Sequence, residues 1–227
     1  MTTVEILGAP FSNYVRSALM ALEEKGVPYT VTPSRAHAPE VNAIHPLGKI
    51  PCLKHGDFTL FESAAIATYI DRAFEGPALF PAEPQAAARC MQWVSLLNSS
   101  LVPAFQAFAM CHFFPMTADG EPCPDTIAAS LPKTRDHLQL LGRVLGESGY
   151  FVGGSFTYAD IAALPMLDYL KDLPETGTII AEIPALGAYL AKHSARKSFE
   201  ATKPPAMAEL MATTKAMARE MMQKRVA

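Results

Sequence analysis

The first eighty residues alternate between short apolar runs and longer amphipathic stretches. Residues 4–8 are apolar, and residues 15–25 repeat Val, Leu and Met at helical spacing before Gly26. This pattern predicts a strand followed by a helix that stops at the glycine. A second strand is expected at residues 29–32, directly after Pro28.

Two more strands and a helix follow a polar, irregular stretch. The runs 52–54 and 59–61 are separated by His-Gly-Asp, which is typical of a hairpin. From Glu62 onward, hydrophobic residues again share one helical stripe, which ends at Gly76. The pattern therefore predicts the order β-α-β, a long connection, and then β-β-α.

No strand pattern continues into the second part of the chain. Residues 77–84 are rich in proline, which suits an interdomain linker. Hydrophobic periodicity then predicts about five helices, the first of them kinked by Pro103. Their ranges are 85–114, 127–145, 158–173, 184–193 and 205–223. Residues 1–76 and 85–227 are accordingly predicted to be two domains, the second all-helical.

Composition and charge narrow the class of function. The formal net charge is −3 and no Lys/Arg cluster occurs, so we expect no nucleic-acid partner, because phosphate contacts need a basic surface. The N-terminus has no signal-peptide pattern, and no window reaches the ~18 apolar residues of a membrane span. We expect a cytoplasmic protein without a membrane partner. The four cysteines contain no C-x-x-C pair, which predicts free, mostly buried thiols and no metal site.

A proline opens the third predicted strand. Pro51 precedes the run 52–54, a position that tolerates proline only where its missing N–H is not needed. If the Ile50–Pro51 bond is cis, the N–H and C=O of Ile50 face outward and can pair with an extended peptide ligand. An ordinary trans proline at a strand start is the alternative.

The dipeptide Glu62-Ser63 lies where the last strand ends and the next helix begins. Ser63 can offer its hydroxyl and N–H to a carboxylate at the positive end of the helix dipole. Glu62 can hold an ammonium group, so the pair suits an α-amino-acid head group. The alternative is that Ser63 only caps its helix.

These residues together resemble a known family. The segment Pro-Leu-Gly-Lys-Ile-Pro-Cys-Leu at 46–53, followed by Leu-Phe-Glu-Ser at 60–63, is similar to the glutathione-binding signature of the cytosolic glutathione transferases. A second segment, 153–161, resembles the family's helix-capping motif, in which Thr157 caps a helix and Asp160 reaches back to it. The resemblance covers nearly the whole chain.

The resemblance implies the fold, the co-substrate and the assembly. It implies an N-terminal thioredoxin-like α+β domain of order β-α-β-α-β-β-α, and an all-α helix-bundle domain after it. Glutathione is the implied co-substrate, no metal is implied, and a homodimer is expected. The function implied is conjugation of glutathione to small hydrophobic electrophiles in detoxification. Peroxidase or dehalogenase activity, and a non-catalytic binding or regulatory protein, are the alternatives.

The resemblance also assigns residues to the glutathione site. The backbone of Ile50, before Pro51, would pair with the cysteinyl backbone, and Glu62 and Ser63 would take the γ-glutamyl end. Lys49 would hold the glycyl carboxylate. His37 and His45 lie in the irregular connection and could reach the same carboxylate; a solvated surface role is the alternative for the lysine.

Activation of the thiol needs a further group, because an unperturbed thiol has a pKa of ~8.5. Ser12 falls where serine-type classes of the family place their catalytic residue, at the start of the first predicted helix. A plain helix cap is the alternative for Ser12, and Tyr14 is its rival as the donor. Asn13 and Tyr14 depart from the patterns that follow the serine in known classes, so no class is assigned.

An aromatic and methionine-rich segment in the first long helix matches the place where the family lines its electrophile pocket. We expect Phe108, Met110 and Phe113 to contribute to this pocket, together with Phe11 and Tyr14. An apolar wall of this kind suits hydrophobic ligands. For each residue taken separately, core packing is the alternative.

Overall fold

The computed structural model describes residues 3–113, 117 and 121–204. The chain forms two compact units that take residues from distant parts of the sequence, the first from 1–94, 150–165 and 192–203 and the second from the remainder. The domain boundaries expected from sequence stay a prediction, because compactness groups residues by contact rather than by chain order. The helix expected at 205–223 lies outside the described residues.

A four-stranded sheet forms the centre of the first unit. Its strands are β1 (Val4–Gly8), β2 (Tyr29–Pro33), β3 (Cys52–His55) and β4 (Phe58–Phe61). Their spatial order is β2-β1-β3-β4, with β1 parallel to β2 and the other neighbours antiparallel. This confirms the thioredoxin-like α+β sheet and the expected hairpin.

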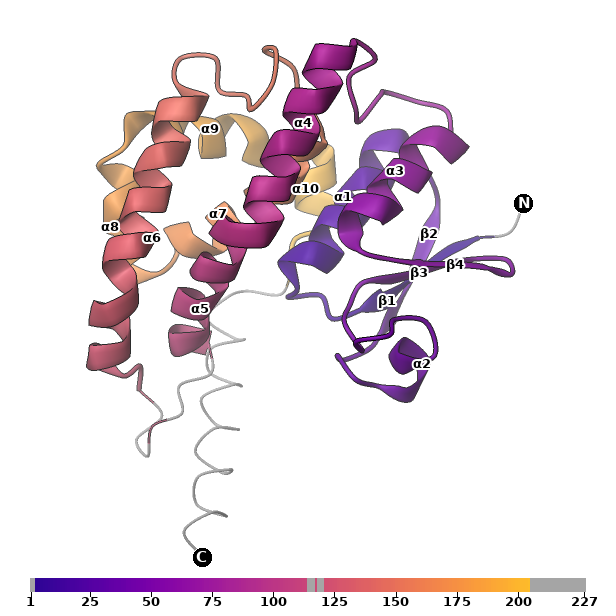
Figure 1. Ribbon diagram of the computed structural model, residues 1–227, viewed down its shortest axis with the longest axis horizontal. Helices are drawn as coiled ribbons and strands as arrows, with labels where there is room; N and C mark the ends of the chain where they lie inside the picture. The colour runs from indigo at the N-terminus through magenta and orange to yellow at the C-terminus, as the bar shows by residue number, and fades with distance from the viewer. Residues whose placement is uncertain (1–2, 114–116, 118–120, 205–227) are drawn as a thin grey trace, which may run out of the picture. The chain divides into compact units, whose positions relative to one another are not determined.

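Helices cover both faces of this sheet. Figure 1 shows α1 (Asn13–Lys25) and α3 (Ser63–Ala73) together on one side and α2 (Pro39–Asn42) on the other. The return from β1 into α1 is tight, since a Cβ on Gly8 would lie 2.3 Å from Cγ2 of Val15. Helix α1 ends at Gly26, whose φ of 66° suits a left-handed cap.

The face that carries α2 has its own small core. Leu7 and Cys52 are neighbours across β1 and β3, and both pack on Ala38 and Val41 from the segment around α2. The hydrophobic residues Ile44, Ile50 and Phe61 lie against the same cluster. This core fixes the start of β3 and the end of β4 next to each other.

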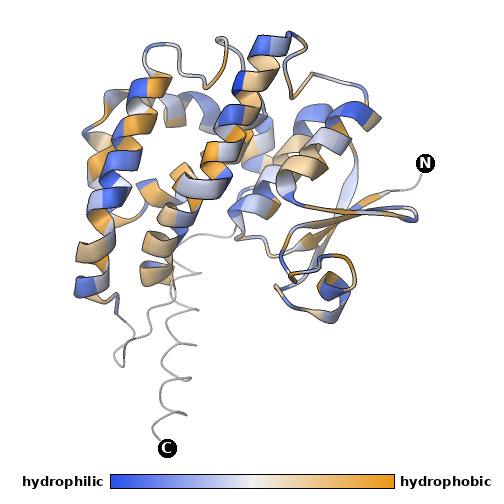
Figure 2. Cartoon of the chain, viewed as in Figure 1, coloured by the Kyte–Doolittle hydropathy of each residue, from blue (hydrophilic) through white to orange (hydrophobic). Residues whose placement is uncertain are grey.

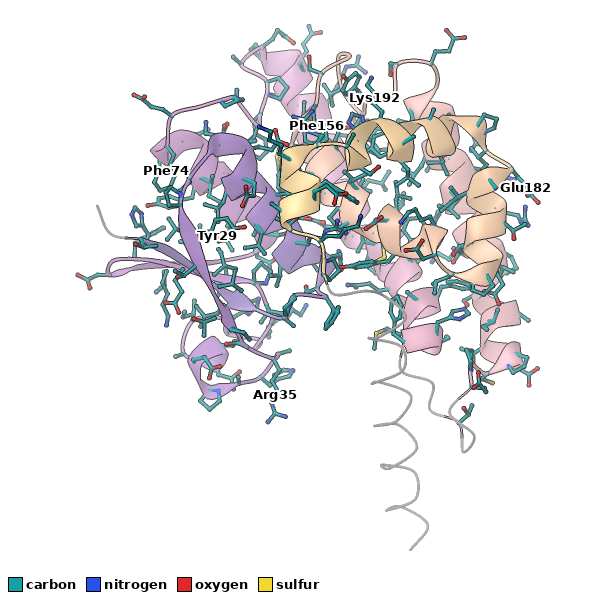
Figure 3. The ribbon with its side chains drawn as sticks, turned by 180° about the vertical axis from the view of Figure 1, so that it is seen from behind. Tyr29, Arg35, Phe74, Phe156, Glu182 and Lys192 are labelled. Atoms are coloured by element: carbon teal, nitrogen blue, oxygen red, sulfur yellow. The ribbon has the colours of Figure 1, made fainter. Side chains whose placement is uncertain are left out.

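The helix α10 (Lys197–Ala201) joins the first unit through α1. Arg16 is fully buried, its guanidinium stacks 4.1 Å from the centre of the Phe199 ring, and its Nη2 donates to the Phe199 carbonyl at 3.3 Å. Arg196, the residue before α10, stacks in the same way, with its guanidinium carbon 3.9 Å from the centre of the ring of Phe156, which Figure 3 labels. A cation packed on an aromatic face can be buried at lower cost than an isolated one.

A partly buried ion pair attaches α10 to α1. Arg196 donates to both carboxylate oxygens of Glu24, at 2.8 and 2.6 Å, and Ser198 donates to the same carboxylate. Burial raises the pKa of Glu24, but the hydrogen bonds of Arg196 and Ser198 and the arginine charge outweigh it, so that the pKa lies below its ordinary value. Ionised Glu24 therefore stabilises the folded protein.

Replacement of Glu24 by glutamine is expected to destabilise the protein by about 1 kcal/mol at neutral pH, allowing for the partly exposed arginine. Because the folded pKa is lowered, this stabilisation is complete above the unfolded value of 4.5 and is lost as the pH falls through the folded value. Urea unfolding of wild type and Glu24→Gln at pH 7 and pH 3.5 checks this: the difference should shrink in acid. A constant difference would contradict it.

Among the residues that the structure describes, the regular elements of the second unit are all helices. The segment Pro84–Leu96 (α4) belongs mainly to the first unit, and the helix then continues through the π-helical turn η1 (Leu97–Leu101) into α5 (Val102–Phe113). Pro103 cannot donate to the carbonyl four residues earlier, inside η1, and a π turn absorbs such a defect. The expected disturbance of the long helix thus occurs just before the proline.

The other helices of the described residues are α6 (Pro124–Leu145), α7 (Tyr158–Lys171), α8 (Pro174–Ala181) and α9 (Pro184–Ser194). In α6 the buried residues recur three and four apart, and Figure 2 shows hydrophilic residues along its other side. The all-α character of the second part is therefore confirmed. Helices α8 and α10 were not expected from sequence.

Among the described residues, the helical segment Pro84–Phe113 is long and apolar enough to cross a membrane by length and composition alone. The core helix of a folded protein passes the same test. In the structure its buried residues recur at intervals of three and four, as on a helix packed against a core. They include Cys90, Val94, Leu97, Leu101, Phe105 and Phe108.

Candidate glutathione site

The turn from β4 into α3 presents Glu62 and Ser63. Ser63 is the first residue of α3 and is buried, while the side chain of Glu62 is 66 % exposed. Glu62 has a φ of 68°, and its carbonyl accepts the first helical hydrogen bond from Ile66 at 2.9 Å. Positive φ is uncommon for a residue other than glycine and often marks a functional turn.

The segment before β3 contains Ile50 and Pro51, whose backbone was expected to pair with a peptide ligand. The Ile50–Pro51 peptide bond is cis. Ile50 is partly buried against the α2 core, and Lys49 is exposed. The expected site residues of this segment therefore lie at the edge of the α2 face.

His37 lies beside this segment. Its N–H donates to the Gly48 carbonyl at 2.8 Å, and its own carbonyl accepts from Asn42 at 3.0 Å. The backbone bond holds His37 next to the residue that precedes Lys49, and both side chains are exposed. Figure 3 shows Arg35, from the same connection, extending away from the body of the unit. The connection thus exposes three basic side chains, those of Arg35, His37 and Lys49.

Ser12 is the N-cap of α1. Its backbone is extended, with φ −72° and ψ 120°, and its Oγ accepts from the Val15 N–H at 3.3 Å. A hydroxyl that accepts one hydrogen bond keeps its own proton for donation to another group. Ser12 is half-buried. Capping and donation to a ligand are therefore compatible roles for this residue.

Tyr14 lies in the first turn of α1 and is half-buried. Burial first, and then the negative charge of Glu62, raise the pKa of Tyr14 to about 12. Tyr14 is therefore a weaker proton donor than an ordinary phenol, and its hydroxyl shares an electrostatic environment with Glu62.

The structure adds Tyr158 to this group. Tyr158, at the start of α7, is fully buried, and burial raises its pKa above the ordinary value, with the Ser63 hydroxyl opposing and the charges of Cys90, Tyr14 and Glu62 adding. Two of these groups, Ser63 and Glu62, are expected to hold the γ-glutamyl end, so Tyr158 shares their electrostatic environment. From sequence, this residue was expected only as part of a capping motif, and no local pattern could show what its side chain faces.

The capping motif itself forms as expected. Asp160 Oδ2 accepts from the Thr157 N–H at 2.8 Å and from the Thr157 hydroxyl at 3.1 Å, and Asp160 Oδ1 accepts from the Phe151 N–H at 3.2 Å. Burial raises the pKa of Asp160 to about 6, although these donors oppose the shift. The carboxylate ties two separate backbone segments together.

The residues expected to line an electrophile pocket occupy different surroundings. Phe11 is half-buried beside Ser12 in the chain. Phe108 and Phe113 are buried in the second unit, where their rings lie 5.2 Å from that of His112 and 6.3 Å from that of Tyr169. Met110 is 47 % exposed. Core packing thus engages both phenylalanines, and Met110 is the exposed one of these three residues of α5.

Cysteines and possible metal ligands are the remaining reactive side chains. All four cysteines are free, with Cys52 and Cys90 buried and Cys111 and Cys123 partly exposed. Among the residues that the structure describes, no three His, Cys, Asp or Glu side chains are grouped to hold a metal ion. The candidate site therefore consists of hydroxyls, a carboxylate, cationic side chains and backbone groups.

Two family models match separate parts of the chain. Residues 6–78 match the N-terminal domain of glutathione S-transferase, and residues 124–192 match the C-terminal domain of the same family. The first match contains Ser12, Pro51, Glu62 and Ser63, and the second contains the capping motif around Asp160.

Curated proteins of similar sequence carry the same description. Glutathione S-transferase F10 of Arabidopsis thaliana is 28 % identical over 85 % of this chain and 93 % of that protein. Glutathione S-transferase 4 of Zea mays is 29 % identical over 82 % of this chain and 85 % of that protein.

Solved structures agree with the sequence matches. Glutathione transferase F7 from Populus trichocarpa superposes with a TM-score of 0.80 and 27 % identity, covering 92 % of this chain and 99 % of that one. The theta class glutathione S-transferase of Xanthomonas axonopodis pv. citri, solved with glutathione bound, gives 0.78 and 27 %, covering 91 % and 100 %.

Proposed function

Because the chain belongs to the glutathione S-transferase family and is a glutathione transferase, we propose that Ser12 stabilises the glutathione thiolate for attack on small hydrophobic electrophiles. The observation that carries this proposal is the geometry of Ser12. Its Oγ accepts from Val15 at the N-terminus of α1, and its proton stays available for a sulfur anion.

A hydrogen bond and a helix N-terminus can together supply the free energy that lowering the thiol pKa requires. Lowering a thiol pKa by two units takes ~2.7 kcal/mol. A hydrogen bond to a charged group contributes about 1.5–3 kcal/mol, and a helix N-terminus adds ~0.3–1 kcal/mol. Ser12 combines both effects, since it caps the 13-residue helix α1. The rival Tyr14 lies inside the first turn of α1 rather than at its N-cap, and burial and the charge of Glu62 raise its pKa to about 12, so it is a weaker acid than an ordinary phenol.

The tripeptide is proposed to bind along the edge that carries α2. The backbone of Ile50, before the cis bond to Pro51, pairs with the cysteinyl residue, and Ser63 and Glu62 take the carboxylate and ammonium of the γ-glutamyl end. Lys49 and His37 hold the glycyl carboxylate. The backbone bond between His37 and Gly48 supports this grouping.

Replacing Ser63 by alanine is expected to weaken glutathione binding about 10- to 100-fold, because a hydroxyl bonded to a carboxylate contributes about 1.5–3 kcal/mol. Isothermal titration with glutathione measures this. Thr68→Ala, on the same helix with its hydroxyl bonded to the Ala64 carbonyl, is the matched control. Equal affinities of Ser63→Ala and wild type would rule out the proposed γ-glutamyl site.

Phe108, Met110 and Phe113 of the second unit are proposed to form an apolar wall that contacts the electrophile. The exposure of Met110 supports its direct contact with a ligand, and a flexible thioether adapts to ligands of different shape. The buried phenylalanines would contribute by shaping the wall behind it. Such a wall suits detoxification of small hydrophobic electrophiles.

We further propose a cytoplasmic homodimer, as the family resemblance implies. Large hydrophobic side chains of the first unit support a dimer, since they are exposed in the single chain. Leu47 is 64 %, Phe58 45 % and Met91 41 % exposed. An interface between two copies would remove this apolar surface from water.

A further inference from the structure

His45 is a buried histidine in the connection between α2 and β3. It is 4 % exposed, and its ring lies 4.6 Å from that of Phe61 at an angle of 39°. Phe61 is the last residue of β4 and directly precedes Glu62. The imidazole is therefore held by packing against the strand that delivers the Glu62-Ser63 turn.

One ring nitrogen of His45 is already engaged. The Leu47 N–H donates to Nδ1 at 3.0 Å. A nitrogen that accepts a hydrogen bond carries no proton, so in the neutral ring the proton resides on Nε2. The backbone thereby selects the tautomer that can donate from Nε2.

The donor nitrogen faces Glu62. Nε2 lies 3.6 Å from Oε1 of Glu62, slightly beyond hydrogen-bond distance, and among the described residues His45 is the basic side chain within 4 Å of this carboxylate. Glu62 is otherwise exposed, at 66 %. A free glutamate samples many rotamers, and fixing one costs conformational entropy. A buried, oriented donor this close needs only a small rotation of the glutamate to form a hydrogen bond that would restrict it.

We infer that His45 is a positioning residue, whose Nε2–H holds the Glu62 carboxylate toward the α-ammonium of the γ-glutamyl group. This inference rests on the proposed function. It differs from the role expected from sequence, where His45 was grouped with His37 as a contact for the glycyl carboxylate. Burial and the contact with Glu62 direct its donor to the γ-glutamyl side of the site.

Two variants separate orientation from packing. His45→Phe keeps a ring that can pack on Phe61 but has no donor, and His45→Gln keeps an N–H donor on a side chain of similar reach. His45→Phe is expected to raise KM for glutathione about 5- to 20-fold with kcat within about twofold, because lost ground-state binding acts on KM. His45→Gln should recover part of the loss.

The decisive probe is glutaryl-cysteinylglycine, which is glutathione without its α-amino group. Wild type should bind glutathione more tightly than this analogue, and in His45→Phe that preference should fall at least threefold. In a Glu62→Gln background, His45→Phe should cause no further loss, as a double-mutant cycle would detect. Unfolding midpoints of all variants control for folding.

The outcomes are distinguishable from failure of the proposed function. A wild-type protein that does not bind glutathione would overturn the proposed function, and with it this inference. A wild type that prefers glutathione over the analogue, with the same preference in both His45 variants, would overturn the inference alone. A fall in preference in His45→Phe with recovery in His45→Gln would support it.

Discussion

Replacing Ser12 by alanine is expected to lower kcat/KM for the conjugation of glutathione to an aryl halide by about 10- to 100-fold, since the lost hydrogen bond to the thiolate contributes about 1.5–3 kcal/mol. The pKa of the bound thiol should rise toward its free value of ~8.5, shifting the pH–rate profile to higher pH. Affinity for S-methylglutathione, which forms no thiolate, should change little.

Two variants control this experiment. Ser12→Gly removes the hydroxyl while leaving an accepted N-cap, so it costs only a few tenths of a kcal/mol in stability where alanine costs ~1 kcal/mol. Tyr14→Phe should keep activity within about threefold, because in the proposed mechanism the thiolate accepts from Ser12 at the N-cap of α1 and not from Tyr14 inside its first turn. A larger loss in Tyr14→Phe than in Ser12→Gly would identify the tyrosine as the activating group. Glutathione binding without turnover in wild type would favour the binding-protein alternative.

Replacing Asp160 by alanine is expected to destabilise the protein by about 2–4 kcal/mol, because it removes a helix cap and leaves buried backbone donors without an acceptor. The affected groups are the N–H groups of Thr157 and Phe151, together with the Thr157 hydroxyl. Asp160→Asn keeps one acceptor oxygen and should lose less. Urea unfolding measures both variants; equal stability of Asp160→Ala and wild type would mean that the capping motif contributes nothing.

The effect of Asp160 should also depend on pH. Burial raises its folded pKa from 3.8 to about 6, so the folded state retains a proton that the unfolded state has lost between these values. The contribution of Asp160 to the free energy of unfolding therefore falls as the pH rises through that range. The difference in unfolding free energy between wild type and Asp160→Ala should accordingly be smaller at pH 7 than at pH 4.5. A difference that grows with pH would mean that the hydrogen bonds outweigh burial.

Local patterns predicted the regular elements that are long and amphipathic. The helix expected at 15–25 is Asn13–Lys25, and the strands and the hairpin agree with the pattern within a few residues. Hydrophobic periodicity did not reveal the short helices α2, α8 and α10, because four to eight residues span too few turns to show it. Helix α10 depends instead on the stacking of Phe199 on Arg16, across 183 positions in sequence.

In the candidate site too, local sequence patterns identified some residues and only the tertiary structure identified others. Pro51, Glu62, Ser63 and Ser12 were identified from sequence, because each lies at the junction of two regular elements, where composition is constrained by backbone geometry. Tyr158 was not identified as part of the site, since its relation to Ser63 and Tyr14 arises only when α7 packs in the first unit.

His45 shows most clearly what the tertiary structure decided. The sequence by itself determined that a histidine lies near a glycine-proline segment in a polar connection, and that a glutamate and a serine open the third helix of the first unit. Which ring nitrogen carries the proton, and which carboxylate it faces, depends on a backbone N–H two residues away and on Phe61, sixteen residues later in the chain. Packing against Phe61 brings these groups together, and no local pattern encodes a contact between side chains that are distant in the chain.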